Sequence, residues 1–144
     1  MKNSIKINFI SSVYAFSLFI AIELIINVYR ISRVTGWSLD VVMVVIPVII
    51  LIGAAFSTLL MIGMIRKWMI GRKIVYWSVL IWCPYFLLFY YLFTSLFPLN
   101  SGETWFPLFN ILIYGLIVLY PVYIFIINRY ATSVVMTVES SAGI

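Results

Sequence analysis

Four long apolar runs, joined by short connections, constrain this sequence more than any other feature. The runs cover residues 9–29, 41–65, 74–97 and 106–127. Each reaches the roughly 20 residues that a helix needs to cross the hydrocarbon core of a bilayer, and none alternates apolar and polar residues as a barrel strand does. The sequence therefore predicts an all-α membrane protein, with four transmembrane helices in one integral membrane domain over residues 1–144.

The composition favours a membrane over water as the surrounding medium. Hydrophobic residues make up 65% of the chain and charged residues only 9%, whereas a soluble domain carries about 25% charged residues. Because the connections between the runs are short, helices that follow one another along the chain should pack as antiparallel neighbours. The expected architecture is a four-helix antiparallel bundle whose outer surface is covered by lipid.

The basic residues predict the direction in which the helices cross the membrane. The connection 66–73 holds four of them: Arg66, Lys67, Arg72 and Lys73. If this loop is cytoplasmic, both termini are too, and seven basic residues lie inside against two outside. Cytoplasmic loops carry an excess of Lys and Arg, so we expect a cytoplasmic N-terminus and C-terminus. This strong bias favours a multi-pass protein of the bacterial inner membrane, and the four loop residues could also bind anionic lipid headgroups.

Most residues that enzymes and metal sites need are missing or scattered. The chain has no histidine, one cysteine (Cys83) and four acidic residues in separate segments. Histidine is the commonest general base near neutral pH and the commonest metal ligand, and no nucleotide-binding or nucleophile-elbow motif occurs. We therefore expect no catalytic residue, no metal and no other cofactor. The basic residues cluster at the ends of apolar runs, which favours a membrane surface over nucleic acid as their partner.

Glu23 is the most unusual residue of the first run, about 5–6 Å beyond the middle of that run at about 1.5 Å per residue. Burying a charge in the membrane costs about 2.5–3.5 kcal/mol on insertion scales, so Glu23 should face other helices, water or a partner. Asn27 and Arg30 follow one and two turns along the same helix face. This stripe is either a set of polar contacts, with Arg30 reaching outward to water, or a proton or cation site.

A second polar stripe lies on the last run. Asn110 and Tyr114 share one helix face with Ile124 and Asn128, at about 100° per residue. In the predicted topology Asn110 and Tyr114 lie level with Glu23, and a hydrogen bond between the two helices would satisfy both sides. Such bonds are worth about 0.5–2 kcal/mol in membranes. We therefore expect Asn110 and Tyr114 to belong to the same binding or packing site as Glu23.

Aromatic side chains form a continuous stripe on the third run. Its members are Trp82, Phe86, Phe89, Phe93 and Phe97. An aromatic wall opposite Glu23 could hold a lipophilic cation by cation–π contact. Lipid contact and rigid packing are the simpler explanation, because an aromatic stripe alone specifies no ligand.

Two classes of function are favoured over a third, an intramembrane enzyme acting on lipid, which would need a catalytic base that the sequence does not supply. The first is a non-enzymatic accessory, regulatory or immunity-type protein that binds a membrane partner through helix contacts at Glu23, Asn27 and Asn110. The second is a small homo-oligomeric transporter or channel with Glu23 as its proton or cation site. Four helices with a glutamate in the first are similar to the plan of small multidrug exporters, but here Glu23 lies late in its helix and the surrounding motif differs. The expected partners are the lipid bilayer and either another membrane protein or a second copy of the chain.

Overall fold

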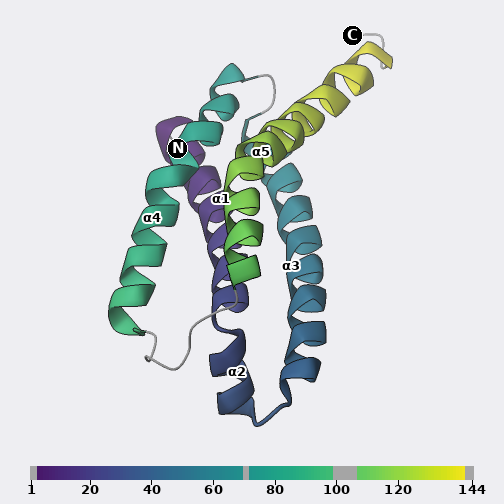
Figure 1. Ribbon diagram of the computed structural model, residues 1–144. Helices are drawn as coiled ribbons and strands as arrows, with labels where there is room; N and C mark the ends of the chain where they lie inside the picture. Colours follow the sequence, from purple (N-terminus) through teal and green to yellow (C-terminus); the bar gives the residue numbers. More distant parts are fainter. Residues whose placement is uncertain (1–2, 70–71, 99–106, 142–144) are drawn as a thin grey trace.

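The computed structural model describes residues 3–69, 72–98 and 107–141, with the side chains of the last helix described over 110–133, and it contains no strand in these ranges. The elements in chain order are α1 (Asn3–Ile26), α2 (Val28–Thr35), α3 (Leu39–Trp68), the short 3₁₀ helix η1 (Lys73–Trp77), α4 (Ser78–Leu96) and α5 (Pro107–Ser141) (Figure 1). The prediction of four helices long and apolar enough to cross a membrane is confirmed; they are Asn3–Ile26, Leu39–Trp68, Lys73–Leu96 and Asn110–Ser133.

The ends of two helices differ from the ends of the apolar runs. The first helix begins at Asn3 and is interrupted at Asn27. The first apolar run, in contrast, begins at residue 9 and continues to residue 29. The last helix continues to Ser141, well past the apolar run that ends at residue 127. Hydropathy marks the part of a helix that lipid can cover, whereas the helix itself extends as far as its backbone bonds continue.

The first helix, α1, is the most buried of the four long helices. In its most apolar 18-residue window 44% of the residues are buried, against 11% in each of the other three. It packs against α3, α4 and α5, and α3 also packs against α5 (Figure 1). Large apolar side chains therefore remain exposed along α3, α4 and α5, an arrangement that lipid can cover without loss of stability.

A buried polar network joins three parts of the fold around Asn128. The Tyr14 hydroxyl of α1 donates to Asn128 Oδ1 (3.2 Å). Asn128 Nδ2 donates to Ser78 Oγ (2.9 Å) and to the Val75 carbonyl oxygen (3.2 Å). Asn128 and Ser78 are fully buried. This network connects α1, α5 and the junction of η1 with α4 through directional bonds, which apolar packing alone cannot supply.

Candidate functional site

Glu23 and Asn27 form a hydrogen-bonded pair at the end of α1. Asn27 Nδ2 donates to the Glu23 carbonyl oxygen (2.9 Å) and to Glu23 Oε2 (2.8 Å). Glu23 is 8% exposed and Asn27 is 7% exposed. The spacing of four residues, which places both side chains on one helix face, thus produces the contact that the sequence indicated.

This pair also explains why the first helix is interrupted. The Glu23 carbonyl oxygen accepts the Asn27 backbone N–H (2.9 Å) as well as the Asn27 side chain. A side chain that binds the carbonyl four residues earlier competes with the helix ladder and bends the helix. Asn27 takes φ −91° and ψ 17°, outside the helical range, and α2 starts at the next residue.

The position of the break places Glu23 nearer the helix end than expected. Because α1 begins at Asn3 and ends at Ile26, Glu23 lies in its last turn, about 13 Å from the middle of the helix at about 1.5 Å per residue. The distance of about 5–6 Å from the middle of the apolar run 9–29 is unchanged, because the larger value reflects only that α1 begins six residues before this run. A side chain in the last turn of a spanning helix is closer to the headgroups, where burying charge costs less.

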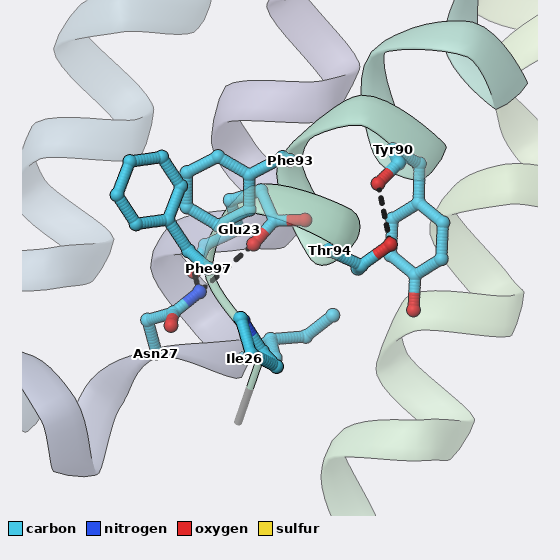
Figure 2. Close-up of a pocket in the computed structure, with 8 residues that line it drawn as sticks. Glu23, Ile26, Asn27, Tyr90, Phe93, Thr94 and Phe97 are labelled. Atoms are coloured by element: carbon cyan, nitrogen blue, oxygen red, sulfur yellow. Dashed lines mark hydrogen bonds between the residues drawn. The ribbon is translucent and has the colours of Figure 1, made fainter. Parts of the chain in front are cut away.

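A cavity of about 230 Å³ lies beside the pair, between the ends of α1 and α4. Eight residues line this cavity, called here the Glu23 pocket: Glu23, Ile26, Asn27, Tyr90, Phe93, Thr94, Phe97 and Pro98. In Figure 2 one carboxylate oxygen of Glu23 accepts the bond from Asn27, and the other points away from Asn27, toward the side on which Thr94 and Tyr90 lie. That second oxygen, Oε1, is buried and has no hydrogen-bond partner in the part of the chain that the structure describes. The pocket therefore contains a buried acceptor without a donor.

Arg30 binds the end of α4 at the rim of the pocket. Its guanidinium donates to the Phe97 carbonyl oxygen (3.3 and 3.4 Å) and to the Pro98 carbonyl oxygen (2.7 Å). The last carbonyls of a helix lack backbone partners and carry partial negative charge, so a cation stabilises them. Arg30 also attracts Glu23 electrostatically. The expectation that Arg30 reaches outward to water missed this role as a link between α2 and α4.

The structure does not place Tyr114 and Asn110 against Glu23. Tyr114 is 68% exposed and Asn110 is half-buried, whereas Ile113 is only 8% exposed. This part of α5 is rotated so that Ile113 faces the core in place of Tyr114. Within the described residues, no hydrogen bond joins either side chain to Glu23 Oε1. The expected bond between the two polar stripes is therefore wrong for this conformation.

Residues of α4 lie beside Glu23, where residues of α5 were expected. Tyr90 and Thr94 line the Glu23 pocket together with Phe93 and Phe97. The two phenylalanines belong to the aromatic stripe of the third run, so the sequence did indicate an aromatic wall near Glu23. Tyr90 and Thr94 carried no such signal, because the register between α1 and α4 is set by packing that periodicity does not reveal.

The basic residues lie at the opposite end of the molecule. Arg66 and Lys67 end α3, and Arg72 and Lys73 flank the start of η1. This end lies beside the start of α1, because Ser4, Asn8, Ile74 and Trp77 line a common cavity. The Arg66 guanidinium lies over the Tyr130 ring, 5.6 Å from its centroid, and the other three basic residues are exposed.

The arrangement offers hydrogen-bond acceptors and aromatic rings, but no cluster of metal ligands. Over the described ranges, no three His, Cys, Asp or Glu residues come together to hold a metal ion. No protein-family model, curated protein or solved structure matches the chain. A function must therefore be argued from the geometry of the Glu23 pocket and from the two chemically different ends of the molecule.

Proposed function

We propose that the chain is a polytopic protein of the bacterial inner membrane, an antiparallel four-helix bundle with both termini in the cytoplasm. Four helices of sufficient length and apolar character support the membrane assignment. The basic residues around 66–73 support the orientation, because they lie together at one end of the molecule and the Glu23 pocket lies at the other. In this orientation the Glu23 pocket belongs to the outer half of the membrane.

The proposed function is a non-enzymatic accessory, regulatory or immunity-type role, exercised by binding a membrane partner through helix contacts. The observation that carries it is the buried Glu23 Oε1, which has no donor among the described residues and lies beside a cavity of about 230 Å³. A buried acceptor left unpaired costs about 1–3 kcal/mol. A partner that supplies the missing donor recovers this free energy, and α4 leaves the approach open because Thr94 and Phe97 are exposed.

Replacing Glu23 with leucine is expected to weaken the association with the membrane partner at least about tenfold. The substitution removes the acceptor, and a hydrogen bond to a charged group is worth about 1.5–3 kcal/mol. The measurement is the amount of each co-purifying chain, by quantitative mass spectrometry after extraction from the native membrane in a mild detergent. Asn8→Leu is the matched control, because Asn8 is an exposed polar residue of the same helix outside the Glu23 pocket. Equal recovery of the partner with Glu23→Leu and Asn8→Leu would exclude Glu23 from the contact.

A second candidate is a homo-oligomeric transporter or channel, which the same unpaired carboxylate oxygen favours. Four helices enclose little space of their own, so a pathway would form between copies. Under this alternative, Glu23→Gln removes the proton or cation site and abolishes proton-coupled flux in liposomes, while the oligomer mass stays unchanged. Flux at the wild-type rate in Glu23→Gln would exclude Glu23 from such a pathway.

A further inference from the structure

We propose that the group bound in the Glu23 pocket is an alkylammonium group, which donates to Glu23 Oε1 and lies against the aromatic rings of α4. This inference rests on the proposed function and names the chemistry of what the partner places in the pocket. The same chemistry has two sources, the lysine side chain of a partner helix and a small free primary amine. Three properties of the pocket support an ammonium group: its unpaired hydrogen-bond acceptors, its charge and its size.

The hydrogen-bond inventory of the Glu23 pocket shows a surplus of acceptors. Both N–H donors of Asn27 are used, one by the Glu23 carbonyl oxygen and one by Glu23 Oε2. The Thr94 hydroxyl donates to the Tyr90 and Tyr91 carbonyl oxygens. The Tyr90 side chain lines the same pocket and carries one hydroxyl donor, yet Glu23 Oε1 and Asn27 Oδ1 remain buried and unpaired among the described residues. An ammonium group carries three donors and no acceptor, so it complements what these side chains leave free.

The charge and the rings of the pocket favour a cation. A carboxylate removed from water is stabilised chiefly by a paired positive charge. Tyr90, Phe93 and Phe97 line the same cavity, and the faces of such rings attract a cation within about 6 Å. The carbonyl oxygens at the end of α4 add partial negative charge beside the pocket. Arg30 offsets part of this charge by donating to the Phe97 and Pro98 carbonyl oxygens. Arg30 binds these two carbonyl oxygens and not Glu23 Oε1, which no described residue pairs.

The size of the pocket selects a small group. Drug-sized ligands occupy pockets of about 300–1,000 Å³, and the Glu23 pocket measures about 230 Å³. A butylammonium group, which is the end of a lysine side chain, fits within it. A metal ion suits the site less well, because hard cations take about six or more oxygen ligands and Glu23 supplies the only carboxylate among the described residues that line the pocket.

The test titrates three probes into the full-length protein in phosphatidylcholine nanodiscs, followed by saturation-transfer NMR. n-Butylammonium is expected to bind. n-Butanol should bind at least about tenfold more weakly, because it lacks the charge. Tetramethylammonium should also bind more weakly than n-butylammonium, because it lacks N–H donors. Glu23→Gln should reduce n-butylammonium affinity at least about tenfold. Asp40→Asn is the matched control, because it removes one carboxylate from an exposed position in the first turn of α3.

A second variant keeps the test valid if Glu23→Gln fails to fold. Phe97 is 55% exposed, so Phe97→Leu removes a ring from the pocket at small packing cost and should weaken n-butylammonium binding severalfold. Displacement of the co-purified partner by n-butylammonium would identify the source as a partner lysine. Binding of n-butylammonium to the wild-type protein with the partner retained would identify a free amine.

The failures of the two proposals can be told apart. If n-butylammonium binds wild type and Glu23→Gln equally, or no more tightly than n-butanol or tetramethylammonium, the ammonium inference is overturned. Loss of the partner in Glu23→Leu would then still support the proposed function through other chemistry. If n-butylammonium binds through Glu23 and no second protein co-purifies, the ammonium site is supported and the accessory function is not.

Discussion

Replacing Asn128 with leucine is expected to destabilise the folded helix assembly by about 2 kcal/mol. This loss is expected even though leucine has more apolar surface than asparagine, which by itself favours an apolar environment. The side chain of Asn128 makes three hydrogen bonds, to Tyr14, Ser78 and Val75. Hydrogen bonds between membrane helices average about 0.6 kcal/mol each, so their loss accounts for about 2 kcal/mol. Leucine also leaves the Tyr14 hydroxyl without its acceptor in a fully buried position.

The measurement for Asn128→Leu is an unfolding titration with sodium dodecyl sulfate in mixed micelles, followed by tryptophan fluorescence. Asn110→Leu is the matched control, because Asn110 lies on the same helix, is half-buried and makes no side-chain hydrogen bond to a described residue. Asn110→Leu should change the unfolding free energy by less than about 0.5 kcal/mol. Similar stability of the two variants would mean that the Asn128 network contributes little to the fold.

The helices could be predicted from the sequence because hydropathy reports directly on what lipid can cover. All four long apolar helices correspond to runs that are visible by eye. The interruption at Asn27 could not be predicted in this way, because it depends on one amide that competes for the Glu23 carbonyl oxygen. The extension of α5 to Ser141 was missed for a related reason, since helical backbone bonds continue beyond the apolar segment.

The site was predictable only where it depends on a single helix. The contact between Glu23 and Asn27 follows from their spacing. The contacts between helices do not, because a rotation of α5 that brings Ile113 inward leaves Tyr114 exposed. Tyr90 and Thr94 enter the Glu23 pocket through the packing of α1 on α4. Asn128 lies on the predicted stripe of the last run, yet its partners Tyr14 and Ser78 lie far away in sequence.

Neutralising the four basic residues of segment 66–73 is expected to produce a mixture of two membrane orientations. In the proposed topology the wild type has seven Lys and Arg residues inside and two, Arg30 and Arg33, outside. Replacing Arg66, Lys67, Arg72 and Lys73 with glutamine leaves three inside against two outside, so the charge bias that sets orientation nearly disappears. The measurement is the activity of reporter fusions at the C-terminus, one reporter active in the cytoplasm and the other outside it.

The matched control separates charge from residue identity. Lys67→Arg combined with Lys73→Arg keeps every positive charge and should leave a single orientation. Arg66 also packs over the Tyr130 ring, so a variant that retains Arg66 and neutralises only Lys67, Arg72 and Lys73 distinguishes lost packing from lost charge. This triple variant should shift the orientation less than the quadruple variant does, because four basic residues remain inside.

A single orientation in the quadruple variant would show that charge at this end does not set the topology. The distribution of basic residues would then no longer support a location of the Glu23 pocket in the outer half of the membrane.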